Sequence, residues 1–215
     1  MKVSKLLVDR EFLLVVAIAI FYAALSFAYS FIGFLHYEPG SHFHEYSGAR
    51  LAVEVGGHLL FGFIAAIPFL DLRISLLTSG LAILIDVDHI LSALNFDVSG
   101  RPDHSIMYAI ISSLFIVYLA TKLRLSKQVR IKLAFVGTVT ILAHLSYDVF
   151  AAQGSSFQIF IPFSFQSVSF GFDSWVYLEA AALVVAFLGL LFARRFGRSP
   201  IEVGHITARR AVKRR

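Results

Sequence analysis

The segment AILIDVDHIL, at positions 82–91, is an apolar run that ends in Asp86, Asp88 and His89. Ionisable side chains are costly inside a membrane, and those that occur there usually serve a function. On a helix, Asp86 and His89 share a face, whereas Asp88 lies about 160° round from Asp86. Either a site here wraps a wide arc of the helix, or the helix loosens where it meets water.

The same kinds of side chain recur in other segments. Glu54 and His58 are four positions apart, as are His144 and Asp148 in the segment HLSYD, so each pair lies on one helix face. His104 lies in another short motif, RPDHS. Imidazole and carboxylate groups are ligands that Zn²⁺, Mn²⁺ and Fe²⁺ take in proteins. The pattern predicts a divalent metal site, with zinc favoured and manganese or iron as alternatives.

Seven residues are candidate metal ligands, namely His58, Asp86, Asp88, His89, His104, His144 and Asp148. A catalytic zinc ion uses about three protein ligands, and a structural zinc ion uses four. Seven side chains would suit two ions, or one ion with further carboxylates that orient the histidines. A purely structural polar cluster and a path for protons or ions are the alternatives to a metal site.

The composition indicates a membrane protein. Hydrophobic residues make up 58% of the 215 positions and charged residues 15%, whereas soluble domains have about 45–50% and about 25%. The chain has no cysteine, which excludes disulfides and thiolate metal ligands.

Six stretches are long and apolar enough to predict transmembrane helices. We expect an all-α protein, with a single six-helix bundle over residues 1–193 and a basic tail at 194–215. The first stretch is longer than the apolar part of a signal peptide, so we expect it to be retained. The predicted spans are 12–35, 51–70, 74–91, 104–121, 133–151 and 175–193.

Lysine and arginine are distributed unevenly over the predicted connections. Of the 19 basic residues, only Arg50 and Arg101 lie on one side of a six-span arrangement, and all others lie on the opposite side. Positive charge stays cytoplasmic, so we predict a multi-pass protein of the cytoplasmic (inner) membrane with both termini in the cytoplasm. The tail is expected to contact anionic lipid headgroups. Nucleic-acid binding is not expected, because the tail has no interleaved aromatic residues.

This topology places the ionisable residues of several spans at one depth, near the extracytoplasmic surface. Four stretches lie nearer the cytoplasm, 59–70, 74–85, 106–121 and 133–143. None of them contains Asp, Glu, His, Lys or Arg. Transporters bind their substrates near the midplane of the bilayer. The pattern therefore favours an enzyme over a metal or proton transporter, which stays the alternative.

The ordered motifs resemble the YdjM-like family of membrane-bound metal-dependent hydrolases. The resemblance covers roughly residues 50–165 and implies a metal-dependent hydrolase. The family usually has Arg-Gly-x-Thr-His-Ser before its fourth helix, whereas here Pro102 replaces the glycine, one residue is missing and Asp103 stands in place of threonine. The matching elements are His58, DVDH at 86–89, RPDHS at 101–105, HLSYD at 144–148, Gly154 and Pro162.

Four further residues are candidates for catalysis. Glu54, one turn from His58, is the first candidate for a general base, and Asp103 is the second. Asp103 is alternatively an extra ligand or the N-cap of the following helix. Arg101 could pair with a phosphate or carboxylate of a substrate, or lie in water as an interfacial arginine. Ser105, kept beside the motif histidine, completes this set.

The Phe-rich segment at 152–174 is not predicted to span the membrane. Pro162 and the interleaved Gln and Ser argue against a helix, and the partial alternation favours a hairpin or an extended interfacial segment. Such a segment would lie at the headgroup boundary over the predicted site. A lipid or lipid-linked ester is therefore the expected substrate, and simple packing over the bundle is the alternative role of this segment.

Overall fold

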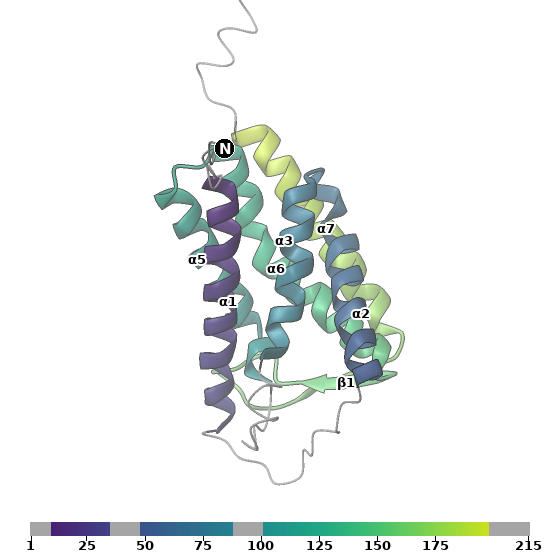
Figure 1. The fold of residues 1–215 in the computed structure, drawn as a ribbon. Coiled ribbons are helices and arrows are strands. Elements are labelled where there is room, and N and C mark those ends of the chain that lie inside the picture. The colour runs from purple at the N-terminus through teal and green to yellow at the C-terminus, as the bar shows by residue number, and fades with distance from the viewer. Residues whose placement is uncertain (1–9, 35–47, 88–100, 198–215) are drawn as a thin grey trace, which may run out of the picture.

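The apolar stretches fold into helices that run along one bundle in the computed structural model, which describes residues 10–34, 48–87 and 101–197 (Figure 1). Short 3₁₀ turns, η1 to η3, and a two-stranded sheet connect these helices. In chain order the elements are α1 (Arg10–Phe34), α2 (Gly48–Ala66), η1 (Ile67–Phe69), α3 (Leu72–Leu84), η2 (Ile85–Val87), η3 (Pro102–His104), α5 (Ile106–Lys122), α6 (Lys127–Ala151), β1 (Gly154–Phe157), β2 (Val168–Gly171) and α7 (Ser174–Phe196).

Helix α6 is the centre of the bundle. It packs against α2, α3, α5 and α7, while α1 packs against α3 and α5. Within an 18-residue apolar stretch of each helix, 67% of the α6 residues are buried in the bundle, compared with 28% in Ala52–Phe69 and 33% in α7. The outer helices therefore expose large aliphatic side chains such as Ile20, Leu60 and Val184. A belt of this kind is expected where helices face lipid.

The two ends of the bundle differ in charge. Helices α1, α3 and α6 begin at the same end, where α2, α5 and α7 finish (Figure 1). We call this the basic end. Among the described residues, Arg50 in the first turn of α2 and Arg101 directly before η3 are the only basic positions at the opposite end. The basic end carries Arg10, Arg73, Lys122, Arg124, Lys127, Arg130, Lys132, Arg194 and Arg195.

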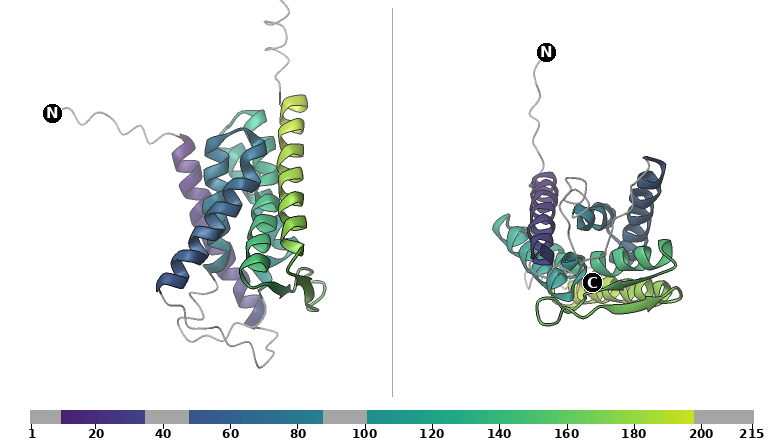
Figure 2. Two further views of the ribbon diagram at one scale, coloured as in Figure 1. Left: turned by 90° about the vertical axis from the view of Figure 1, so that its right-hand side faces the viewer. Right: turned by 90° about the horizontal axis from the view of Figure 1, so that it is seen from below.

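The helices occupy the stretches that hydropathy predicts, and the fold is predominantly helical. Three described segments are long and apolar enough to cross a membrane, Ala52–Phe69, Lys127–Ala151 and Ser174–Phe196, and the apolar helices Leu13–Tyr29 and Ile106–Lys122 are shorter. The all-α prediction was incomplete, because β1 and β2 pair as an antiparallel sheet. This pairing confirms a hairpin within the Phe-rich segment, and it lies beside the ends of α6 and α7 (Figure 2).

The third predicted span, 74–91, is interrupted earlier than expected. Helix α3 ends at Leu84, and Asp86 has backbone angles φ −78° and ψ 19° that do not continue a helix. Leaving the regular pattern of α-helical hydrogen bonds at this point lets the side chain of Asp86 turn toward the neighbouring helices. Of the two alternatives for this segment, the loosened helix is therefore correct at Asp86.

Small residues let α2 approach its neighbours closely. A Cβ atom on Gly62 would lie 3.0 Å from the Cα atom of Ser79 on α3. At the same contact, the Ser79 hydroxyl donates a 2.7 Å hydrogen bond to the carbonyl of Leu59. Close backbone approach at glycine and hydrogen bonds between helices are common means of helix association in membranes. The contact fixes the distance between α2 and the end of α3.

Replacing Gly62 by leucine is expected to lower the free energy of unfolding by about 1–3 kcal/mol, because the side chain would push α3 away. Titration with SDS in mixed micelles measures this change. Gly56→Leu is the matched control, since nothing lies within 4 Å of a Cβ atom at that position on the same helix. Equal losses in the two variants would show that the contact between α2 and α3 does not determine stability.

Candidate metal centre

His144 is held in one orientation by the end of α3. It is fully buried in the last third of α6. Its Nδ1 lies 2.7 Å from the carbonyl oxygen of Ala82. Because a carbonyl only accepts hydrogen bonds, Nδ1 carries the proton of the neutral ring and Nε2 presents a lone pair. The acceptor is available because α3 ends at Leu84 and leaves its last carbonyl groups without partners in the helix.

His104 is oriented in the same way by a carboxylate. It ends the 3₁₀ turn η3 and is fully buried, with Nδ1 2.9 Å from Oδ1 of Asp103. The other oxygen of Asp103 lies 3.2 Å from the hydroxyl of Ser26 on α1, which also contacts the carbonyl of Ile85 at 2.8 Å. Asp103 thus accepts a hydrogen bond from the ring of His104, while its other oxygen shares the single hydroxyl proton of Ser26 with the carbonyl of Ile85. Nε2 of His104 is left to face the interior.

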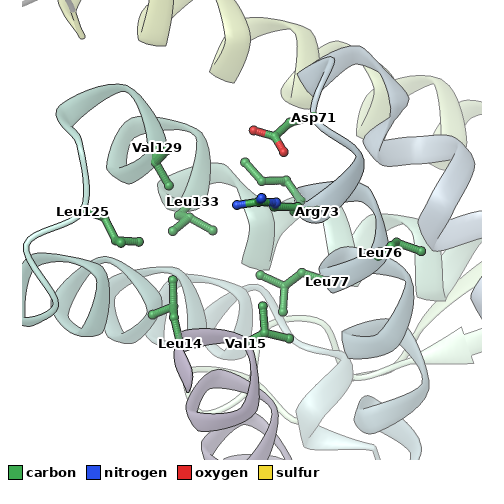
Figure 3. A pocket seen from close by; sticks show the side chains of 10 residues that line it. Leu14, Val15, Asp71, Arg73, Leu76, Leu77, Leu125, Val129 and Leu133 are labelled. Atoms are coloured by element: carbon green, nitrogen blue, oxygen red, sulfur yellow. The ribbon is translucent and has the colours of Figure 1, made fainter. Parts of the chain in front are cut away.

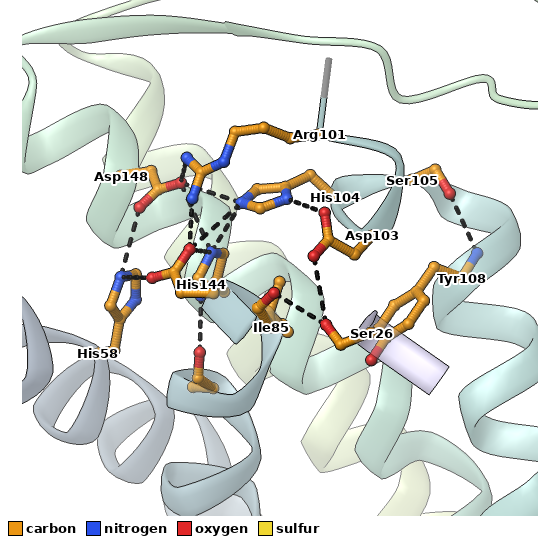
Figure 4. A network of polar contacts seen from close by, with 12 residues as sticks. Ser26, His58, Ile85, Arg101, Asp103, His104, Ser105, Tyr108, His144 and Asp148 are labelled. Atoms are coloured by element: carbon orange, nitrogen blue, oxygen red, sulfur yellow. Dashed lines mark hydrogen bonds and ion pairs between the residues drawn. The ribbon is translucent and has the colours of Figure 1, made fainter. Parts of the chain in front are cut away.

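The two histidines point at one another through the nitrogen atoms that remain. Nε2 of His104 and Nε2 of His144 are 2.9 Å apart (Figure 4). Two lone pairs at this distance repel each other unless a proton or a cation is shared between them. Histidines that donate from Nδ1 to a carboxylate or carbonyl, and aim Nε2 at a common point, are arranged as metal ligands are.

Two carboxylates complete the arrangement. Nε2 of His58 is 2.9 Å from Oδ2 of Asp86 and 3.4 Å from Oδ1 of Asp148. The other oxygen of Asp86 lies 3.4 Å from Nε2 of His144, and that of Asp148 lies 3.3 Å from Nε2 of His104. Each carboxylate therefore turns one oxygen toward His58 and the other toward the histidine pair. We call these five residues the His/Asp cluster.

The cluster has the composition and dimensions of a metal site. Ligand atoms of His58, Asp86, His144 and Asp148 all lie within 4.8 Å of one another, and this group could hold a metal ion. Three imidazoles and two carboxylates form a donor set suited to Zn²⁺, Mn²⁺ or Fe²⁺. Each carboxylate turns one oxygen toward His58 and the other toward the histidine pair, and this arrangement is compatible with one ion or with two.

Aromatic rings enclose His58 on α2. Its ring stacks on that of His144, with centroids 4.1 Å apart and an interplanar angle of 7°. The edge of Tyr147 packs against it at 4.5 Å. A Cβ atom on Gly57 would collide with the ring of Tyr147, so the glycine beside His58 is what admits this ring. No polar group in the described part of the chain forms a hydrogen bond with Nδ1 of His58, so packing is what orients its ring there.

Arg101 links the two carboxylates directly. One guanidinium nitrogen donates a 2.7 Å hydrogen bond to Oδ2 of Asp148, and the other donates to Oδ1 of Asp86. The planar guanidinium fork suits this bridging geometry. Its positive charge offsets the repulsion between two neighbouring carboxylates, and its side chain is 23% exposed, so the cluster approaches the surface on this side.

The remaining predicted residues lie around the cluster or outside the described chain. Ser105 is the N-cap of α5, accepting from the backbone N–H of Tyr108 at 3.1 Å, so Asp103 is not the cap of this helix. Glu54 lies one turn before the cluster histidine of α2, half-buried, with Tyr147 as a neighbour. Asp88 and His89 lie outside the described residues.

Several contacts of the cluster were not predicted. Phe157 of β1 is buried and stacks on His104, with centroids 5.4 Å apart and an interplanar angle of 9°, so the hairpin covers this side of the site. Ser26 was missed because it is a lone hydroxyl in a long apolar stretch. The contact of His144 with the carbonyl of Ala82 was missed because a backbone group leaves no mark in the amino-acid sequence. Tyr147 could have been found from its position between His144 and Asp148.

Comparison with protein-family models finds no match, and no curated protein and no solved structure matches the chain. The resemblance to the YdjM-like family therefore rests on the order and spacing of the motifs, and it stays a prediction.

The contact between Asp103 and His104 predicts a measurable effect on metal affinity. Asp103→Asn is expected to weaken metal binding about 10–100-fold, because the ring loses the carboxylate that sets its orientation and basicity. Titration of the chelator-treated protein with Zn²⁺ measures the affinity. Asp173→Asn removes an exposed carboxylate at the start of α7 and should leave it unchanged. An unaltered affinity in Asp103→Asn would exclude His104 as a ligand.

Proposed function

We propose that the chain is a six-span protein of the cytoplasmic (inner) membrane, with both termini in the cytoplasm. The alternating direction of the helices and the charge difference between the two ends support this topology. Helix α3 is only 13 residues long, about 20 Å at 1.5 Å per residue. The third span therefore has to include the turn that carries Asp86. The His/Asp cluster then lies near the extracytoplasmic face.

The function that the geometry supports best is that of a metal-dependent hydrolase. The observation that carries it is the convergence of Nε2 of His104 and Nε2 of His144 on two carboxylates, with both Nδ1 atoms already bound. A divalent ion held there would lower the pKa of a bound water to about 7 and so supply a nucleophile at neutral pH. Zinc suits the donor set best, with manganese or iron as alternatives.

The protein side chains have separate roles in this proposal. His58, His104, His144, Asp86 and Asp148 hold the ion, and Asp103 orients one of these histidines. Glu54, one helical turn from His58, is the proposed general base. Arg101 holds the two carboxylates together and, being partly exposed, is the group that a phosphate of the substrate would meet first.

A lipid or lipid-linked ester, such as a phosphoester, is the proposed substrate class. The hairpin segment beside the cluster exposes Phe160 and Phe163, the latter 81% accessible. Exposed aromatic side chains at this level are expected to contact the lipid headgroup region. A substrate anchored in the outer leaflet would reach the site along this surface.

Transport of metal ions or protons is the alternative function. It would require charged or imidazole side chains along the bundle toward the basic end. In the described helices, the stretches 59–66, 74–84, 106–121 and 133–143 contain no Asp, Glu, His, Lys or Arg. The geometry therefore favours the hydrolase.

Metal analysis of the purified chain tests the site. Protein prepared without chelator is expected to contain one or two divalent ions per chain, measured by mass spectrometry of the elements. His144→Ala and Asp148→Asn should lose nearly all of this metal, because each removes a ligand from the centre of the cluster. Asp71→Asn changes a carboxylate at the basic end and should retain it. Metal-free wild-type protein would refute both the hydrolase and the metal transporter.

Activity in vesicles separates the enzyme from the transporter. The reconstituted chain is expected to hydrolyse lipid phosphoesters in the presence of its metal, without metal flux into the vesicle. Glu54→Gln should lower kcat by about 10²–10⁴-fold, the usual contribution of a general base, with metal content unchanged. Metal flux that His144→Ala abolishes, in the absence of any hydrolysis, would establish the transporter instead.

A further inference from the structure

A cavity unrelated to the His/Asp cluster lies at the basic end of the bundle (Figure 3). Its volume is about 560 Å³, and eight of its ten lining residues are aliphatic. The two others are Asp71 and Arg73. Cavities of roughly 300–1,000 Å³ with mainly apolar walls and a few polar groups are typical of small-molecule sites. The composition of this cavity indicates an amphiphilic ligand.

The cavity has a buried inner wall and an exposed aliphatic rim. Leu14, Leu77 and Leu133 are buried and form its inner wall, contributed by the second turns of α1, α3 and α6. Val15 and Leu76 lie on its rim and are 36% and 57% exposed. In a membrane this rim would face acyl chains. A lipid chain can therefore enter without crossing a polar surface.

Positive charge lies at the headgroup level of the same cavity. The guanidinium of Arg73 reaches across the cavity in Figure 3. The carboxylate of Asp71 is paired with Lys132 on α6, with 3.2 Å between Nζ and Oδ2. Together with Arg73, this pair leaves a net charge of +1 among the three side chains at the mouth. Basic pockets between helices on the cytoplasmic side are known to suit anionic lipid headgroups.

We propose that this cavity binds an anionic phospholipid of the cytoplasmic leaflet. One acyl chain lies along the aliphatic wall between α1 and α3, and the phosphate contacts Arg73. A zwitterionic lipid carries its own cation beside the phosphate and gains less from the arginine. The cavity therefore selects phosphatidylglycerol over phosphatidylcholine.

Native mass spectrometry of the full chain in detergent, with phosphatidylglycerol or phosphatidylcholine added, measures this selectivity. Arg73→Gln is expected to weaken phosphatidylglycerol binding about fivefold, the effect of one basic residue near an anionic lipid surface, and to leave phosphatidylcholine binding unchanged. Arg194→Gln removes the same charge from the exposed last turn of α7 at the same end and should have no such effect. Equal losses in the two variants would overturn the proposal, since general surface charge would then explain the binding.

The position of the acyl chain is tested separately. A phosphatidylglycerol with a photoreactive acyl chain should label the first two turns of α1, α3 and α6 in the wild-type chain. Val15→Trp fills the rim of the cavity and should abolish this labelling while leaving the metal content unchanged. Labelling spread over all helices, or confined to the hairpin, would overturn the site. The absence of any labelling would overturn it as well.

Discussion

Two carboxylates that face one another inside an apolar bundle are the constraint on which the described structure depends. Asp86 and Asp148 come from different helices, and a buried charge without a partner costs several kcal/mol. Their compensating groups come from three further places in the chain: His58 on α2, Arg101 before η3 and His104 at its end. These segments must therefore meet in one arrangement, because any other leaves an uncompensated carboxylate in the interior.

Irregular backbone makes this meeting possible. Successive residues of an α-helix point about 100° apart around its axis and do not face each other, so a regular helix could not bring the carboxylate of Asp103 against the ring of His104. Pro102 keeps Arg101 out of the helical region, and Asp103 and His104 lie in the 3₁₀ turn that follows. The end of α3 contributes likewise, since it both turns Asp86 inward and frees the carbonyl that orients His144.

Most of the helices and most of the cluster could be predicted from the sequence, because both follow from simple periodicities. Long apolar runs mark helices, and the spacing of His144 and Asp148 places them on one face. The role of Asp103 could not be predicted, because a carboxylate before a helix has the same local pattern whether it caps the helix or orients a neighbouring ring. In the structure, Ser105 and not Asp103 is the N-cap of α5. The contact of Ser26 with Asp103 depends on tertiary packing, for which a single hydroxyl in an apolar helix gives no sign.

Helix α6 relates the two sites that we propose. Leu133 lines the cavity at the basic end, and His144 lies 11 residues further along the same helix, which is about 17 Å at 1.5 Å per residue. The phosphate of a lipid held at Arg73 is therefore too far from the cluster to be its substrate. A lipid in the cavity can act on the cluster only through the packing of α1, α3 and α6. Helix α3 carries both Arg73 and the carbonyl that orients His144. It is therefore the element through which a lipid bound in the cavity would alter the geometry of the His/Asp cluster.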